Sequence, residues 1–498
     1  MRRLSLLDLA FLFTESRSTP MHVGGLSLFD LPEQADEQEF LQQLANGLRN
    51  ANELQHPFGD KLKTGPLGLA GPAYWQADAS LDMDYHIRHS ALPKPGRYRE
   101  LFNLVSRLHS TLLDRNRPLW EMHLIEGLQN RQFAVYSKYH HAVVDGVRAI
   151  HLAQSMLSKN PRSRLHYSPL SLEAGKRYRE KIKASGQEPY SDGELRNVAD
   201  MVKAQFDSGI QLFGALKKFT GAWLNRGGPL LMPFMDVPAS SINTPVDGAR
   251  RFVAQSWPFA RIREVGKAFD GTFNDAILAM CAGALRLYLM NHAELPGKSL
   301  KAMVPISLRK EGDIDSTNAV GFLSADLATT VKDAGERFTT IKASAHAGKE
   351  FYQHMSARES QLVSTLLQMP GLLLLPLGLM SRLPPYNTVI SNVPGPRQPM
   401  YWNGARLAGM YPASIVTEGI ALNITMVTYD ENVDFGFMAC RRTMPQAQRL
   451  IDYMEQALVE LEVAAGIAAP AANTKTNAKA KTKAKAKRPT RKKTAAVS

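Results

Sequence analysis

Helix and strand patterns alternate along this chain in two successive runs, and this alternation restricts the fold more than any other feature of the sequence. Apolar residues that recur at every second position indicate strands, and those that recur at every third or fourth position indicate helices. Strands mixed with helices in this way are typical of an α/β fold. The first run predicts strands at 23–29, 121–125 and 133–141, and helices at 37–48 and 99–113.

A second run of the same kind begins near residue 246. It includes a predicted hairpin whose turn falls at Asp430, Glu431 and Asn432, and polar residues of this kind are typical of tight turns. Two mixed α/β halves of similar size are therefore expected. The second run predicts strands at 251–257, 300–306, 318–329, 387–392, 421–429 and 433–440, and helices at 259–269, 275–290, 331–355 and 445–461.

Composition divides the chain further. The segment between the halves opens with polar residues and then shows a helix-period aromatic and aliphatic run at 206–223, which predicts an amphipathic helix within a long crossover. The end of the chain is rich in Ala, Lys and Thr and has nothing to bury, so we expect it to be disordered. The predicted units are an N-terminal domain at 1–160, a linker at 161–245, a C-terminal domain at 246–465 and a tail at 466–498.

The positive charge of the chain is concentrated in this tail. The formal net charge is +14, and subtracting the ten Lys and Arg residues at 475–493, among which there is no acid, leaves +4 for the rest. Such a nearly balanced body is not that of a specific nucleic-acid-binding protein. The two cysteines, Cys281 and Cys440, stand alone, which indicates a reducing compartment and leaves no pattern for a structural zinc site.

The apolar runs of the sequence do not favour an exported or membrane-spanning protein. Asp8 interrupts the apolar run near the start of the chain, and no small-residue cleavage site follows it. The run at 363–380 is shorter than the ~20 residues that usually span a bilayer, and Pro370 and Pro376 interrupt it. We expect this run to be buried or to lie on a membrane surface.

A cluster of polar residues, His140-His141-Ala142-Val143-Val144-Asp145-Gly146, follows a predicted strand and is the strongest candidate for chemistry. Successive strand residues point to opposite faces, so the two imidazoles are expected to point apart, which disfavours a shared metal ion. One imidazole could then act as a general base while the other packs. Asp145 and Gly146 are placed to shape the turn. A purely structural histidine followed by an Asp-Gly turn is the alternative.

Several further motifs accompany this cluster in a fixed order along residues 1–465. The motifs are Leu4-Ser5-Leu6-Leu7-Asp8 with Glu15, Thr19-Pro20-Met21-His22-Val23-Gly24, Asp114-Arg115 with Arg117-Pro118-Leu119-Trp120-Glu121, the His140 to Gly146 cluster, Asn274-Asp275, Val304-Pro305-Ile306-Ser307-Leu308-Arg309, Ser391-Asn392-Val393-Pro394-Gly395-Pro396, and Gly419 with Leu422-Asn423-Ile424. Together they resemble the bacterial wax ester synthase/diacylglycerol acyltransferase family, within the CoA-dependent acyltransferase superfamily.

The resemblance implies a two-domain fold like that of chloramphenicol acetyltransferase, with mixed sheets flanked by helices and a tunnel between the domains. It implies that His141 takes the proton of a fatty alcohol or diacylglycerol while the hydroxyl oxygen attacks acyl-CoA, without an acyl-enzyme. Asp145 and His140 complete the implied catalytic set, with Gly146 and Asn274 as substrate-binding residues. Helix capping is the alternative for Asn274, and Arg309 is an implied ion-pair partner of Asp145.

The implied substrates also suggest where the protein works. Acyl-CoA is itself a substrate, so we expect no metal or other cofactor. Because the acceptors are insoluble in water, we expect a cytoplasmic protein bound peripherally to the inner membrane or to lipid inclusions, with the basic tail and the 206–223 helix as contacts. Non-specific contact with nucleic acid is the alternative for the tail. A non-catalytic protein that coats lipid droplets on the same fold is the alternative for the whole chain.

Overall fold

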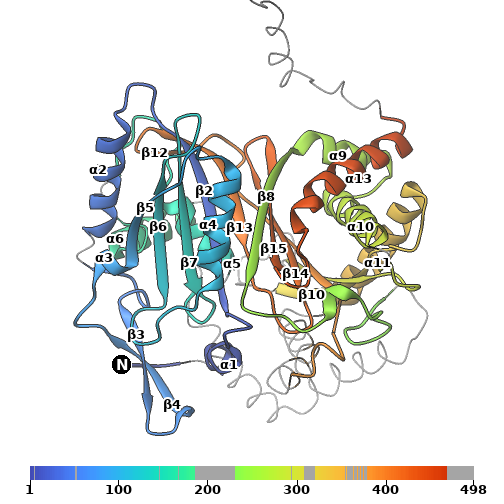
Figure 1. The fold of residues 1–498 in the computed structure, drawn as a ribbon, viewed down its shortest axis with the longest axis horizontal. Helices are drawn as coiled ribbons and strands as arrows, with labels where there is room; N and C mark the ends of the chain where they lie inside the picture. The colour runs from blue at the N-terminus through green and yellow to red at the C-terminus, as the bar shows by residue number, and fades with distance from the viewer. Residues whose placement is uncertain are drawn as a thin grey trace, which may run out of the picture.

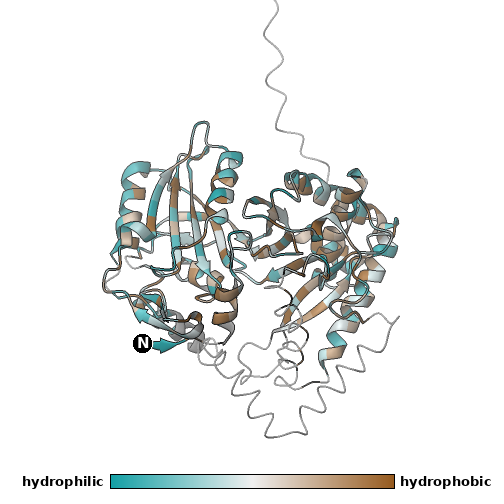
Figure 2. Ribbon diagram, turned by 60° about the horizontal axis from the view of Figure 1, so that its bottom comes forward, coloured by the Kyte–Doolittle hydropathy of each residue, from teal (hydrophilic) through white to brown (hydrophobic). Residues whose placement is uncertain are grey.

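The computed structural model shows two lobes side by side, each built on a six-stranded sheet with helices packed against it (Figure 1). Hydrophobic segments lie in the interior of both lobes, and the outer helices are largely hydrophilic (Figure 2). The structure describes residues 1–467 except for 5, 51–52, 145, 166–167, 185–229, 293, 308–319 and short stretches between 354 and 377. The predicted amphipathic helix at 206–223 and the tail after residue 467 lie outside the described residues.

The sheet of the first lobe has the strand order β12-β13-β2-β7-β6-β5. All neighbouring pairs are antiparallel except β5 and β6, which are parallel. The three predicted strands and two predicted helices of this half are confirmed. They are β2 (His22–Asp30), β6 (Trp120–Glu126), β7 (Gln132–His140), α2 (Glu37–Arg49) and α4 (Tyr98–Ser110), and β5 spans Ile87–Ala91.

The sheet of the second lobe has the order β10-β9-β11-β14-β15-β8, in which β11 runs parallel to both of its neighbours. The predicted elements of this half are also confirmed, with shifts at their ends. The last helix begins later than expected because a short 3-10 helix at Ala447–Arg449 precedes it. The elements are β8 (Arg250–Pro258), α9 (Phe259–Ala268), α10 (Phe273–Asn291), β9 (Lys301–Ser307), β10 (Val320–Asp326), α11 (Ala334–Gln353), β11 (Thr388–Val393), β14 (Leu422–Tyr429), β15 (Asn432–Cys440) and α13 (Leu450–Ala464).

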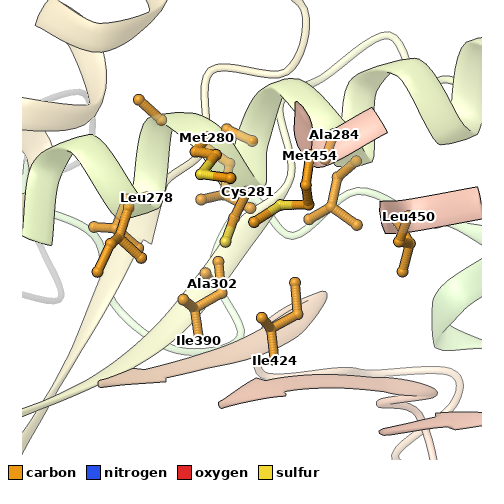
Figure 3. Packing of buried hydrophobic residues seen from close by; sticks show 14 of the residues in the cluster. Leu278, Met280, Cys281, Ala284, Ala302, Ile390, Ile424, Leu450 and Met454 are labelled. Atoms are coloured by element: carbon orange, nitrogen blue, oxygen red, sulfur yellow. The ribbon is translucent and has the colours of Figure 1, made fainter. Parts of the chain in front are cut away.

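Helix α10 forms the centre of the second lobe. It begins with a capping box, in which the Thr272 hydroxyl accepts from the Asp275 N–H and the Asp275 carboxylate accepts from the Thr272 N–H. Its apolar side chains, Cys281 among them, pack between the sheet and α13 (Figure 3). By length and composition α10 is the one described helix that could cross a membrane, but most of it is buried inside the protein, as in a core helix.

Part of the apolar run at 363–380 is described. Val363 and Leu367 are buried in a small cluster with Met232, Tyr352 and Met355. The side chains at these two positions are therefore buried in the protein, which fits the first of the two expectations for this run.

The remaining elements of the structure were not predicted from the sequence. A small sheet of order β1-β4-β3 lies beside the first lobe. Helices α1, α5 and α6 complete this lobe, together with a strand pair from late in the chain. The bounds are β1 (Arg2–Arg3), α1 (Leu6–Thr14), β3 (Asp60–Gly65), β4 (Gly68–Ala77), α3 (Met83–His86), α5 (Gly146–Ser155), α6 (Leu172–Ala184), β12 (Tyr401–Trp402) and β13 (Ala405–Ala413).

Strand β13 changes how the chain divides into lobes. It falls within the range predicted for the C-terminal domain, yet it pairs with β2 in the sheet of the first lobe. A bulge between Leu407 and Gly409 interrupts this pairing. The boundary at residue 246 therefore separates the two halves of the sequence but not the two sheets, because β12 and β13 return to the first sheet.

The lobes meet closely where β13 lies against β15. A side chain at Gly436 would place its Cβ atom 1.8 Å from the Pro412 carbonyl oxygen, so only glycine permits this approach. Nearby, the carboxylate of Asp434 accepts from the Ser256 hydroxyl at 2.6 Å and from the Met410 N–H at 2.7 Å. Asp434 is fully buried, and this burial raises its pKa to about 6 despite both hydrogen bonds.

Asp434 is expected to make the stability of the protein depend on pH. Because its pKa is higher in the folded than in the unfolded protein, the folded state is favoured below pH 4 and loses this advantage as the pH rises through about 6. The free energy of unfolding of the wild type, measured relative to Asp434→Asn in urea, should fall by up to about 3 kcal/mol between pH 4 and 7. A constant difference between the two proteins would contradict the assignment.

Candidate active site

The two histidines of the motif lie where β7 ends. Strand β7 pairs with β2 so that His140 lies opposite His22, and His141 is the first residue of the turn that follows. The main-chain N–H of His141 donates to the Met21 carbonyl at 2.8 Å. The side chain of His141 is partly exposed. Its backbone is thus held by Met21, the residue before β2, while its imidazole can reach a ligand.

His140 has the opposite environment. Its side chain is fully buried, its Nδ1 accepts from the Ala142 N–H at 3.1 Å, and its Nε2 lies 3.4 Å from the Glu15 carboxylate. The two imidazoles therefore differ in exposure. The contacts of His140 are those of a residue that fixes the turn after β7. The catalytic roles of both histidines remain predictions.

Glu15 connects this turn to two other segments. Its carboxylate accepts from Arg115 Nη2 at 2.9 Å and from the Met21 N–H at 3.2 Å, in addition to its contact with His140. Burial alone would raise the pKa of Glu15, but the contact with His140 and the hydrogen bonds from Arg115 and the Met21 N–H lower it below its ordinary value. Glu15 is therefore a buried anion that holds Met21, Arg115 and His140 together next to the turn that carries His141.

A second buried charge cluster lies along β6 and β7 on the same lobe. Lys138 is fully buried, lies 3.2 Å from the Glu121 carboxylate and donates to the Leu108 and Thr111 carbonyls. Although burial opposes ionisation, hydrogen bonding to His123 and the charge of Lys138 lower the pKa of Glu121 to about 2. Lys138 ties the end of α4 to the strand that carries His140.

Glu15 and Glu121 belong to the motifs that carry the family resemblance, but the sequence assigned neither them nor Lys138 a role in the site. A signal existed for the last two, because a charged residue inside an apolar strand is buried and must find a partner. Glu15 offered no such signal, since its partners come from separate segments.

Helix α1 lies against the other side of the turn. Phe11 stacks on the His141 imidazole with ring centroids 4.1 Å apart and planes inclined by 24°. Arg115 also donates to the Leu12 carbonyl of α1 at 2.7 Å, so the cation that binds Glu15 holds this helix in place. The stacking restricts rotation of the imidazole about its side-chain bonds.

Replacing Phe11 by leucine is expected to lower kcat about 2- to 10-fold, because a stacked aromatic pair contributes about 0.5 to 1.5 kcal/mol to the orientation of the ring. Phe13→Leu provides the matched control, since Phe13 lies on the same helix but is exposed. Steady-state rates of both variants give the comparison. Equal rates for the two variants would show that Phe11 does not orient His141.

Asn274 and Asn392 form a second polar group. The Asn392 Nδ2 donates to the Asn274 Oδ1 at 2.7 Å, which brings together the first turn of α10 and the end of β11. The alternative of helix capping is wrong for Asn274, because Thr272 caps α10. The buried Oδ1 of Asn392 has no partner among the described residues. Asn274 itself is exposed and available for a ligand.

The apolar surroundings link this pair to the histidine motif. Val393, next to Asn392, packs against a cluster that contains Ala142, Val143 and Val144 from the turn after His141. The second lobe thus brings β11 to the same apolar core that supports the turn. Substrate binding by Asn274 remains a prediction.

The remaining predicted residues are only partly described. Asp145 and Arg309 lie outside the described residues, so their predicted ion pair is untested. Gly146 begins α5, directly after the turn. Within the described part of the chain, no group of three or more His, Cys, Asp or Glu residues is arranged to hold a metal ion.

Comparisons with known proteins place this chain in a family. Residues 4–277 match the wax ester synthase/diacylglycerol acyltransferase catalytic domain, and residues 316–462 match the C-terminal domain of the same family. A protein of Mycobacterium tuberculosis named as a probable diacylglycerol O-acyltransferase is 44% identical over 462 residues, which make up 92% of this chain and 98% of that protein. O-acyltransferase WSD of Acinetobacter baylyi is 39% identical over 476 residues, 95% of this chain and 99% of that protein.

Solved structures agree with these sequence matches. The wax ester synthase/diacylglycerol acyltransferase from Marinobacter aquaeolei superposes with a TM-score of 0.74 at 41% identity, over 94% of this chain and 100% of that one. The first condensation domain of the CDA synthetase is 16% identical with a TM-score of 0.53 over 94% of this chain and 97% of that one, which shows a shared fold only. The predicted fold class is confirmed.

Proposed function

The chain belongs to the wax ester synthase/diacylglycerol acyltransferase family and is an O-acyltransferase, and we propose that it transfers a fatty acyl group from acyl-CoA to a long-chain fatty alcohol or to diacylglycerol. The observation that carries this proposal is the placement of His141. Its backbone is bound to Met21 and its ring is stacked on Phe11, yet the side chain remains partly exposed. A base that is both oriented and accessible is what the transfer requires.

In the proposed reaction His141 accepts the hydroxyl proton of the acceptor while the hydroxyl oxygen attacks the thioester carbonyl. The carbon–sulfur bond then breaks, coenzyme A leaves as a thiolate that takes up the proton, and the new ester is released. The step needs no acyl-enzyme, because both substrates are held together in one site. A thiolate is a better leaving group than an alkoxide, which favours the ester product. The reaction as proposed uses acyl-CoA as a substrate and no bound cofactor.

We propose further that the amide pair of Asn274 and Asn392 orients the substrate from the second lobe. The hydrogen bond between them leaves the Asn274 amide nitrogen, an N–H donor, on the exposed side chain. A donor of this kind can stabilise the negative charge that develops on the carbonyl oxygen.

The direct test is an assay of the purified protein with palmitoyl-CoA and either hexadecanol or dipalmitoylglycerol. We expect free thiol and ester to form together, and only when an acceptor is present. Thiol release without an acceptor would indicate a hydrolase. Binding of both lipids without thiol release would favour a non-catalytic lipid-coating protein. A panel of alcohols and glycerides then gives the acceptor preference.

We also propose that the protein is cytoplasmic and works at the surface of the inner membrane or of lipid inclusions. The water-insoluble acceptors and the ten cations at 475–493 support this proposal, since each cation near an anionic surface contributes about 1 kcal/mol. Deleting residues 468–498 should reduce the fraction of protein that co-floats with lipid particles. Unchanged flotation would show that the tail is not the contact.

A further inference from the structure

Arginine side chains from both lobes meet at the seam between α4 and β8. These two elements lie side by side (Figure 1), and the Ser110 and Ser106 hydroxyls of α4 accept from the Arg250 and Phe252 N–H groups of β8 at 2.8 and 2.9 Å. The seam is therefore closed by direct hydrogen bonds. These contacts also bring charged side chains of α4 and β8 to the surface of the seam.

Arg251 extends from β8 to α4, where its Nη1 donates to the Asn103 Oδ1 at 3.2 Å. Arg99 lies one helical turn before Asn103, so both residues share a face of α4. Arg441 follows β15, and its N–H donates to the Ala249 carbonyl at 2.9 Å. Because Ala439 lies opposite Arg251, Arg441 is its diagonal neighbour on the same face of the sheet. The charges of Arg99 and Arg441 thus lie near enough to Arg251 to act on it.

None of these three arginines has an acidic partner within the described ranges of the chain. Arg99 and Arg441 are exposed, and Arg251 is half-buried. The Nε of Arg251 is fully buried and has no hydrogen-bond acceptor among the described residues. The carboxylate of Asp247, near the start of β8, instead accepts from the Ala249 N–H and lies 3.9 Å from Arg442.

The unpaired charges repel one another. Burial lowers the pKa of Arg251 below its ordinary value, and the charges of Arg441 and Arg99 lower it further. In most proteins a half-buried arginine is paired with a carboxylate or a phosphate, since a buried donor without an acceptor costs free energy. The cluster therefore has the donors and the charge for an anion with several oxygens.

We propose that Arg99, Arg251 and Arg441 form a binding site for a phosphate group at the seam between the lobes. Guanidinium groups bind phosphate oxygens through paired N–H donors, which a single lysine cannot do. The phosphate belongs either to a soluble phosphate ester, such as coenzyme A, or to the headgroup of an anionic lipid. In either case one anion contacts arginines of both lobes, so its binding holds α4 and β8 together.

The test compares the full-length wild type with Arg251→Gln and Arg441→Gln. Isothermal titration with pyrophosphate and with coenzyme A, at constant ionic strength, covers the soluble source. Co-sedimentation with vesicles of phosphatidylcholine, with and without one quarter phosphatidylglycerol, covers the lipid source. We expect each substitution to weaken binding at least about tenfold in one of these two arms, which corresponds to the loss of a charge-assisted hydrogen bond.

Lys267→Gln is the matched control, because Lys267 is exposed on α9 and has no ion pair in the part of the chain that the structure describes. All variants keep the basic tail, so differences between them report on the seam. Weakening that is confined to Arg251→Gln and Arg441→Gln supports the site and identifies the source of the phosphate. Equal weakening by Lys267→Gln, or no weakening in either arm, overturns it. Both readouts measure binding, so their failure is distinct from a failure of the proposed acyl transfer.

Discussion

Replacing His141 with alanine is expected to lower the rate of thiol release from acyl-CoA by about 10²- to 10⁴-fold, which is the usual contribution of a general base. The loss should appear in kcat and not in KM, because the imidazole acts on the proton that moves in the transition state. Steady-state assays with palmitoyl-CoA and hexadecanol measure both constants. Since His141 lies in a turn and is only partly buried, the variant should remain folded.

Two other histidines serve as controls for this substitution. His346→Ala should leave the rate unchanged, because His346 is exposed on α11 and lies 3.6 Å from Glu350. His140→Ala should reduce the rate less than His141→Ala and should mainly lower stability, because His140 is buried against Glu15. If His140→Ala abolished thiol release while His141→Ala did not, the roles of the two histidines would be reversed.

Glu15→Ala is expected to have the second-largest effect. It removes the acceptor of the Met21 N–H and the charge partner of Arg115, and it leaves His140 without its acidic neighbour. We expect the free energy of unfolding to fall by roughly 2 to 4 kcal/mol, as for the loss of a buried charged group with several partners. We also expect kcat to fall on the order of 100-fold, because His141 is bonded to the Met21 carbonyl and is displaced with Met21.

A conservative substitution of Glu15 separates its effect on the position of His141 from its effect on the stability of the protein. Glu15→Gln keeps an oxygen that can accept from Met21 but loses the charge, so it should recover part of kcat and less of the stability. Glu33→Ala is the control, since Glu33 is exposed near the same lobe's α2. Urea unfolding and kcat, both measured well below the melting temperature, give the two readouts. A Glu15→Ala protein with normal kcat would contradict the positioning role.

The sequence predicted the helices and strands whose apolar pattern is visible within a single segment of the chain. The strand at 133–141 differs from β7 by one residue at each end, because its apolar alternation ends where the histidine motif begins. The helix at 275–290 lies within α10, whose residues from Ala276 to Leu285 are all apolar. The motif also placed His141 at a strand end and separated it from His140, since both conclusions follow from the geometry of a single strand.

The elements that the sequence missed depend on contacts between distant segments. Strand β13 contains glycine and proline, and it is a strand because β2, from the start of the chain, supplies its hydrogen-bonding partners. The Glu15 cluster likewise joins Met21, Arg115 and His140, which come from separate segments of the chain. The contact between Asn274 and Asn392 also depends on how α10 packs on the sheet. No periodicity in one segment can reveal such arrangements.

Because β12 and β13 belong to the first sheet while the rest of their half of the chain builds the second, the second half of the chain cannot unfold completely and leave the first sheet intact. Unfolding of the second half of the chain would remove β13, an interior strand, from the first sheet and would expose the edge of β2. Calorimetry should therefore record a single endotherm whose calorimetric and van't Hoff enthalpies agree. Because β12 and β13 join the second half of the chain to the first sheet, we expect the two lobes to stay together during turnover. Apolar substrates would then enter, and products leave, through local movements of loops and not through a rigid-body opening of the lobes.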